Sequence, residues 1–211
     1  MRILIVDDHA IVRKGLIQII EEAKFVSKVD EADEGKQALD LLSKNKYDVV
    51  IIDLAMPGMD GFEILELVKK SYSGQKVLVL SSYSEELYGM RLIKAGADGY
   101  LRKTSAPGEL LNALVKIANG EKYITTKLAQ EMVEYIQHPV KKKPHDILSE
   151  REFQVMLKIA EGKNLTEIAE ELLLSKKTIS TYRSRLLEKM KIKNNNELIK
   201  YVIEQHLLEC N

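Results

Sequence analysis

The sequence has almost no cysteine and no long apolar run. Its one cysteine, Cys210, leaves no partner for a disulfide within the 211 residues, and such usage fits a reducing compartment. No apolar run approaches the roughly 20 residues that span a bilayer as a helix, and residues 1–6 lack the length and the cleavage site of a signal peptide. We therefore expect a soluble, cytoplasmic protein with no membrane partner.

An excess of one charge is also absent. The sequence balances 32 Lys and Arg residues against 32 Asp and Glu residues, so its overall charge does not indicate nucleic acid, and any basic surface must be local. The apolar fraction of 45% is ordinary for a folded globular protein, and the length allows one or two domains.

What the sequence does contain, over residues 2–119, is an alternation of short apolar runs with longer amphipathic segments. The expected strands cover residues 2–6, 26–31, 49–52, 77–80 and 100–101, and the expected helices cover 11–22, 36–42, 61–70, 85–94 and 108–118. Five strand–helix units predict a doubly wound α/β domain, with a parallel sheet covered by helices on both faces.

Polar residues follow four of these strands directly. Asp7 and Asp8 come after the first strand, Asp53 after the third, Ser81 after the fourth and Lys103 after the fifth. Because ligands bind at the carboxyl ends of parallel strands, these side chains should converge at one edge of the sheet. Three carboxylates repel one another unless a cation joins them, and hard oxygen ligands with open positions suit Mg²⁺. With Asp53 as the nucleophile, the set fits phosphoryl transfer to a carboxylate, whereas Asp53 taken alone would be read as a capping residue.

The character of the chain changes after residue 120. Residues 125–137 have the apolar spacing of a helix that could pack on either half of the protein or on a partner. Two prolines then enclose three lysines over residues 139–144, which indicates an exposed linker. The lysines are either simply solvated or in contact with DNA backbone.

The last third of the chain predicts four short helices, over residues 149–160, 165–173, 176–190 and 195–207. Ser149 followed by Glu152 is a capping box at the start of the first. The middle pair has helix-turn-helix spacing, which predicts a small all-α DNA-binding bundle.

The third of these helices has a local excess of positive charge. Residues 176–193 contain seven basic residues and one acid, Glu188, with short hydroxyl side chains between them. Such groups suit contacts with phosphates and base edges, although a solvated basic face is the plainer alternative. The candidate DNA-binding residues are Lys176, Lys177, Thr178, Ser180, Thr181, Arg183, Ser184, Arg185 and Lys189.

Several motifs carry a family resemblance. Val-Asp-Asp-His at 6–9, Ile-Asp-Leu-Ala-Met-Pro-Gly-Met-Asp-Gly at 52–61, Leu-Ser-Ser at 80–82 and Gly-Tyr-Leu-Arg-Lys at 99–103 resemble a response-regulator receiver domain. Leu-Ser-Glu-Arg-Glu at 148–152, Glu-Ile-Ala-Glu-Glu-Leu at 167–172 and the run 175–186 resemble the LuxR-type helix-turn-helix. The whole is similar to NarL/FixJ-family response regulators. This resemblance implies a flavodoxin-like receiver over residues 1–120, a linker with a helical segment over 121–144 and a DNA-binding domain over 145–211.

The resemblance also implies roles for individual residues. It makes Asp53 the phospho-acceptor, Asp8 and Asp53 direct Mg²⁺ ligands, Asp7 a ligand through water, Ala55 a ligand through its backbone carbonyl, Ser81 and Tyr100 the switch pair, and Lys103 the phosphate-binding lysine. The implied partners are a sensor histidine kinase and double-stranded operator DNA, bound as a homodimer after phosphorylation. The only chemistry implied is Mg²⁺-dependent self-phosphorylation and autodephosphorylation.

Departures from the family patterns and competing interpretations remain. Thr104 replaces the proline that often follows the lysine, and Ser180 stands where many relatives have a base-reading lysine. A haloacid-dehalogenase-like phosphatase would need a second acid at the position of Ala55, and a phosphate-independent DNA-binding scaffold is the other alternative. Tyr100 could be an ordinary core aromatic, and we expect His9 to cap a helix or line the rim of the site rather than bind metal.

Overall fold

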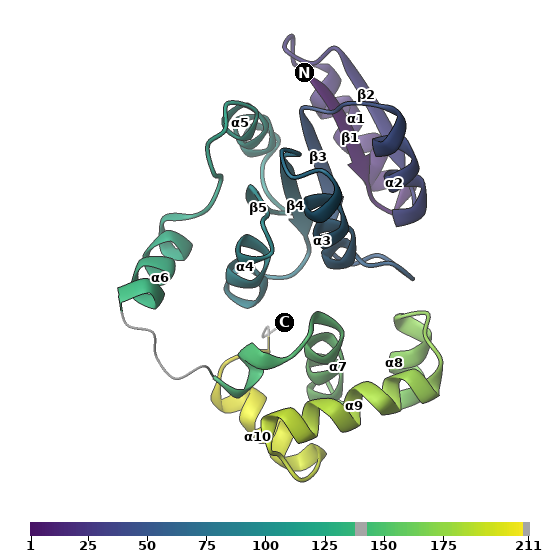
Figure 1. Cartoon of the computed structure of the whole chain (residues 1–211), viewed down its shortest axis with the longest axis vertical. Coiled ribbons are helices and arrows are strands. Elements are labelled where there is room, and N and C mark those ends of the chain that lie inside the picture. The colour runs from purple at the N-terminus through teal and green to yellow at the C-terminus, as the bar shows by residue number, and fades with distance from the viewer. Residues whose placement is uncertain (138–142, 209–211) are drawn as a thin grey trace. The chain divides into compact units, whose positions relative to one another are not determined.

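The computed structural model describes residues 1–137 and 143–208, and the chain divides into two compact units, Met1–Met132 and Val133–Asn211. The expected linker lysines at 141 and 142, with Pro139, lie outside the described residues. Among the helices described, none has the length and apolar character needed to cross a membrane. The N-terminal unit alternates strands and helices, and the C-terminal unit is helical (Figure 1).

All five expected strand–helix units form, with their boundaries shifted by two residues at most. In chain order the elements are β1 (Arg2–Val6), α1 (Ala10–Glu21), β2 (Lys28–Ala32), α2 (Gly35–Lys44), β3 (Val49–Asp53), α3 (Gly61–Ser71), β4 (Val77–Ser81), α4 (Glu85–Lys94), β5 (Gly99–Arg102) and α5 (Pro107–Ala118). The predicted doubly wound fold is therefore confirmed.

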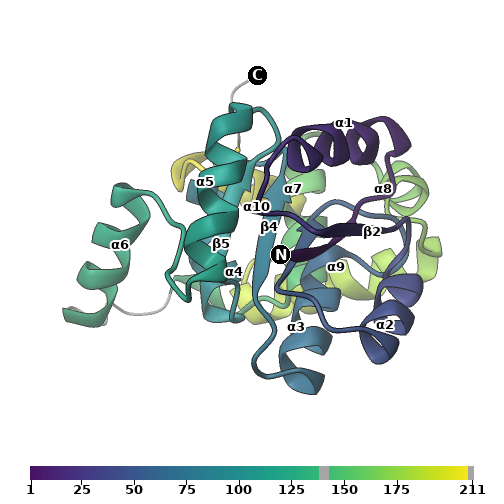
Figure 2. The same cartoon turned by 90° about the horizontal axis from the view of Figure 1, so that it is seen from above.

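The sheet is parallel, with the strand order β2-β1-β3-β4-β5. Both β3 and β4 are buried along their whole length, as continuous β-branched and leucine runs require. Figure 2 shows α1 and α5 on one face and α2 and α3 on the other. The α1/α5 side contains a core cluster in which Ile20 and Leu114 pack over Ile5 and Ile51. The strand order reverses between β1 and β3, the position at which such sheets bind ligands.

The segment after α5 continues along the N-terminal unit instead of leaving it. The Tyr123 N–H donates to the Asp98 carbonyl at 2.9 Å, and the Tyr123 carbonyl accepts from the Tyr100 N–H at 3.1 Å. The helix α6 (Thr126–Gln137) then begins against α4. Leu128 is 2% exposed and packs on Gly89, where an added Cβ would lie 2.9 Å from it.

The C-terminal unit contains the four expected helices, α7 (Glu150–Ala160), α8 (Leu165–Glu171), α9 (Lys176–Met190) and α10 (Asn195–Glu204), preceded by a short 3-10 turn, η1 (Pro144–Ile147). The capping box of Ser149 and Glu152 is confirmed. Both α8 and α10 end earlier than expected, because Leu173 and His206 take left-handed backbone conformations. In each case the next amide bonds back to a carbonyl five residues earlier, which closes the helix.

The loop that follows β3 brings the backbone of Gly61 close to that of Asp53. A Cβ on Gly61 would lie 2.0 Å from the Asp53 carbonyl oxygen, whereas a Cβ on Gly15, exposed in α1, would meet nothing within 4 Å. We expect Gly61→Ala to lower the free energy of unfolding by about 1–3 kcal/mol, because backbone must move. Gly15→Ala should raise it by about 0.5–1 kcal/mol. Urea unfolding of both variants tests this, and equal effects would contradict the close approach at Gly61.

Candidate functional site

Two buried carboxylates meet at the carboxyl edge of the sheet. The parallel register pairs Val6 of β1 with Ile52 of β3, so Asp7 and Asp53, one residue further along each strand, reach the same point. Both are 1% exposed. A buried carboxylate is stable only with a partner, so their environment must supply a positive charge.

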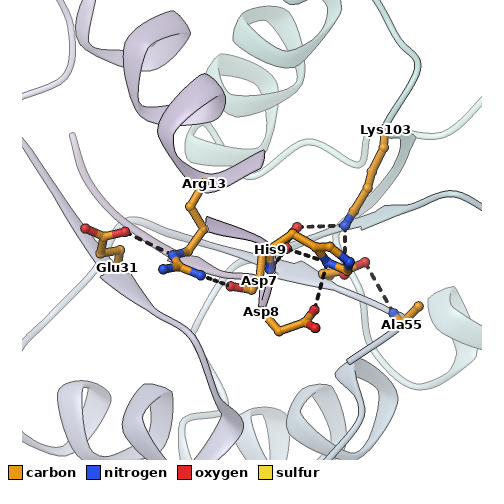
Figure 3. Close-up of polar contacts among 8 residues, drawn as sticks. Asp7, Asp8, His9, Arg13, Glu31, Ala55 and Lys103 are labelled. Atoms are coloured by element: carbon orange, nitrogen blue, oxygen red, sulfur yellow. Dashed lines mark hydrogen bonds and ion pairs between the residues drawn. The ribbon is translucent and has the colours of Figure 1, made fainter. Parts of the chain in front are cut away.

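Lys103 supplies this charge. Its Nζ lies 2.7 Å from Asp7 Oδ2 (Figure 3). It also lies 2.7 Å from Asp53 Oδ2. The backbone N–H of Lys103 donates to the Ser81 carbonyl at 2.8 Å, which ties the residue to the end of β4. The structure thus brings together three predicted site residues from three different strand ends.

Burial and their mutual attraction shift the pKa values of Asp53 and Lys103. Burial raises the pKa of Asp53, and the nearby charge of Asp7 adds to this, while Lys103 and the Ala55 amide oppose it. Burial alone would lower the pKa of Lys103, but its bonds to Asp53 and Asp7 outweigh burial and raise it. The lysine is therefore firmly charged, and the Asp53 carboxyl is a more basic group than an exposed aspartate.

A set of metal-type ligands surrounds the same point. One ligand atom from each of Asp7, Asp8, His9 and Asp53 lies within 4.8 Å of all the others. The buried oxygens Asp53 Oδ2 and Asp8 Oδ1 are held by ion pairs, with Lys103 Nζ at 2.7 Å and with His9 Nδ1 at 3.0 Å. Several carboxylate oxygens gathered at one edge are a donor set that fits a hard divalent cation.

The structure places the His9 ring against the two aspartates, whereas Ala55 contacts the site through its backbone N–H. His9 is the N-cap residue of α1 without a side-chain capping bond, and its Nδ1 lies 3.0 Å from Asp8 Oδ1 and 3.3 Å from Asp7 Oδ1. It therefore lies within the acidic cluster, which sequence position alone did not reveal. The N–H of Ala55 donates to Asp53 Oδ1 at 3.2 Å, while a metal contact through its carbonyl stays a prediction.

The two expected switch residues meet at the backbone of one residue, Tyr83. Ser81 is fully buried, and its Oγ accepts a bond from the Tyr83 N–H at 3.0 Å. Tyr100 is 3% exposed, and its hydroxyl donates to the Tyr83 carbonyl. Tyr83 itself packs its ring 5.0 Å from that of Tyr88 in α4. The two side chains are thus joined through the backbone of a residue that the sequence did not single out.

In the C-terminal unit, most of the predicted DNA-binding residues line one open groove on α9. They are Lys176, Lys177, Ser180, Thr181, Ser184 and Arg185, together with Leu165 of α8 and Glu188. The last two were not predicted, although Glu188 follows Ser184 by one helical turn and could have been placed on this face from its spacing. Thr181 and Ser184 donate their hydroxyl hydrogens to the carbonyls of Lys177 and Ser180, each at 3.0 Å.

The other three predicted residues make contacts inside the unit. Thr178 Oγ1 bonds the N-cap Ser175 at 2.8 Å, and Arg183 Nε donates to Asn195 Oδ1 of α10 at 2.8 Å. Lys189 Nζ lies 2.7 Å from Glu152 Oε2. Burial opposes ionisation of Glu152, yet Lys189 and Ser149 outweigh it and hold the pKa of Glu152 below its usual value. DNA contacts by these three residues stay predictions.

Comparison with known proteins places both halves in families. Residues 3–115 match the response regulator receiver domain, and residues 146–202 match the bacterial regulatory proteins of the luxR family. Response regulator UvrY of Escherichia coli is 37% identical over 212 residues, covering 100% of this chain and 96% of UvrY.

Solved structures support the same family assignment. RcsB of Salmonella enterica serovar Typhimurium, bound to promoter P1flhDC with the phosphomimetic BeF₃⁻, is 28% identical with a TM-score of 0.65, over 97% of this chain and 98% of RcsB. A structure of two RcsB dimers on two parallel DNAs is 29% identical with a TM-score of 0.59, over 96% and 98%. The receiver edge, the helix-turn-helix and these full-length relatives show that the chain belongs to the NarL/FixJ family of DNA-binding two-component response regulators, which control transcription.

Proposed function

We propose that Asp53 accepts a phosphoryl group from a sensor histidine kinase in a Mg²⁺-dependent reaction, and that this controls binding of the C-terminal unit to operator DNA. The observation that carries the proposal is the contact of Lys103 with both Asp7 and Asp53, 2.7 Å each, at the carboxyl edge of the sheet. A lysine held there can neutralise charge on a phosphoryl group as it arrives at Asp53.

In the proposed reaction an Asp53 oxygen attacks the phosphorus while the bond from phosphorus to the donor's imidazole nitrogen breaks. Asp8 and Asp53 would hold the magnesium ion, with Asp7 acting through water, and the ion when bound supplies further charge neutralisation at the phosphoryl oxygens. Lys103 must exchange part of its contact with Asp53 for the phosphoryl oxygens. Arg13 keeps the turn after β1 in place, because its Nη1 donates to the Asp7 carbonyl at 2.7 Å.

The phosphoryl group would alter the hydrogen bonds of the Tyr83 backbone. It adds about −1.5 to −2 charge and attracts the Ser81 hydroxyl, which now accepts the Tyr83 N–H. The carbonyl of Tyr83, in the next peptide unit, accepts the Tyr100 hydroxyl. A change at the Tyr83 N–H would therefore move the residue that holds the other switch side chain, and α4 would follow because Tyr83 packs on Tyr88.

The domain boundaries of the proposal are residues 1–120 for the receiver, 121–144 for the linker and 145–211 for the DNA-binding domain. The contacts of Tyr123 and Leu128 support a linker whose first part is attached to the receiver beside Tyr100. Lys122 adds an ion pair with Asp98 at 2.8 Å, and Lys127 one with Glu86 at 2.9 Å. Movement at Tyr100 or α4 would thus reach the linker directly.

Two phosphorylated chains would bind operator half-sites as a homodimer, with α9 in the major groove. RcsB, the relative solved with promoter DNA and as dimers on DNA, supports this arrangement. The α9 groove supports it as well, because Lys177 and Arg185 provide exposed cations beside the hydroxyls of Thr181 and Ser184. Cations would supply most of the affinity, and the hydroxyls the discrimination between bases.

The phospho-acceptor assignment is tested with acetyl phosphate and Mg²⁺. The protein should gain one phosphate, and Asp53→Asn should gain none because the nucleophile is lost. Asp40→Asn, an exposed carboxylate in α2 paired with Lys44, is the matched control and should label as the parent protein does. Intact-protein mass spectrometry gives the answer, and full labelling of Asp53→Asn would overturn the assignment.

The Mg²⁺ ligands are tested by calorimetric titration. Asp8→Ala removes a carboxylate of the acidic cluster and should weaken Mg²⁺ binding at least about tenfold. His9→Ala removes a nitrogen that Mg²⁺ does not favour and should weaken Mg²⁺ binding clearly less. Equal losses in the two variants would make His9 a magnesium ligand.

The division of labour on α9 is tested by salt titrations on operator and on random DNA. Arg185→Ala should weaken binding to both and flatten the salt slope by about one unit. Thr181→Ala should instead reduce the preference for the operator, by about 1–3 kcal/mol for a true base contact. Lys200→Ala, an exposed lysine of α10, is the control cation. If Arg185→Ala abolishes operator preference and leaves random-DNA binding and its salt slope untouched, Arg185 reads a base.

A further inference from the structure

One acid lies on the groove of α9 to which the proposed DNA contacts belong. Glu188 lines this groove, and the residues that share its face of the helix are Lys177, Thr181 and Ser184. Along the chain these four residues are spaced by four, three and four positions, which keeps them within about 60° of one another around the helix axis. Glu188 is therefore part of the exposed face that we expect to approach bases.

The local structure gives the Glu188 carboxylate no stabilising role. It lies in the last turn of α9, where a negative charge opposes the helix dipole. Lys189, the next residue, is paired with Glu152 at 2.7 Å. Neither Arg185, one turn earlier, nor any other cation in the described part of the chain pairs with Glu188. The carboxylate is thus exposed on the groove and can contact a ligand bound there.

The major groove of DNA offers a carboxylate few favourable partners. Phosphate oxygens repel it because they are negatively charged, and the carbonyl oxygens of guanine and thymine repel it because they are hydrogen-bond acceptors. Adenine presents an amino group beside the acceptor N7, whereas cytosine presents its N4 amino group alone. A carboxylate that approaches base edges therefore favours cytosine over the other three bases.

We propose that Glu188 is a specificity-determining residue, which accepts a hydrogen bond from the N4 amino group of a cytosine in each operator half-site. The inference deepens the proposed function and rests on it, because it requires α9 to lie in the major groove. Glu188 lies about 10 Å along the helix from Thr181. The cytosine is therefore about two to four base pairs from the base that Thr181 approaches, at about 3.4 Å per step. On random DNA the same carboxylate repels phosphates, which widens the gap between operator and random DNA.

The test begins with the selection of binding sequences from a library of random duplex DNA by the full-length protein. The parent protein should select a cytosine at one position of each half-site, and any other base there should weaken binding at least about fivefold. Glu188→Gln should lose this preference and shift it toward adenine, which glutamine binds through N6 and N7. Its preferences at the other positions should stay as in the parent protein. Its affinity for random DNA should rise, because one repulsion of phosphates is removed.

Glu204→Gln is the matched control, because it removes the same charge from an exposed glutamate at the end of α10, outside the α9 groove. It should select the same sequences as the parent protein. Unchanged base preferences in Glu188→Gln would overturn the proposal, even if the variant bound all DNA more tightly, since relief of phosphate repulsion alone explains that result. A parent protein that selects no sequence would instead overturn operator binding by α9, and this inference with it.

Discussion

The ion pair of Lys103 with Asp7 and Asp53 is the interaction on which the receiver edge depends. Two carboxylates that are 1% exposed cannot remain ionised side by side without a compensating charge. Lys103 provides it from the end of a third strand, at 2.7 Å to each. The edge is therefore a preassembled set of charges that a phosphoryl group and a cation can rearrange, at the position where the strand order reverses.

The C-terminal unit uses its charges in two ways. Lys189 compensates the nearly buried Glu152 and so fastens α9 to the start of α7, and Arg183 is bonded to Asn195 of α10. The cations that remain on the groove, Lys176, Lys177 and Arg185, are exposed. Some cations of α9 thus attach it to α7 and α10, while others line its open groove.

The sequence alone determined most of the fold. Continuous apolar runs bounded by polar strand ends specify buried parallel strands, and the capping residues Ser149 and Ser175 specify where α7 and α9 begin. It also determined that Asp7, Asp53 and Lys103 would meet, because parallel strands bring their carboxyl ends to one edge. Each of these results follows from local periodicity or from a topological rule, both of which a single sequence carries.

Only the tertiary structure decided where two helices end and which contacts several site residues make. The early ends of α8 and α10 come from left-handed residues, Leu173 and His206, that are not typical helix terminators. The position of the His9 ring against Asp8 and the double use of the Tyr83 backbone depend on turn conformations after β1 and β4. The division of cations on α9 depends on where α7 and α10 pack. The ion pair and hydrogen bond of α9 join residues far apart in the chain, and the turn conformations do not follow from apolar periodicity, so the sequence pattern did not predict these features.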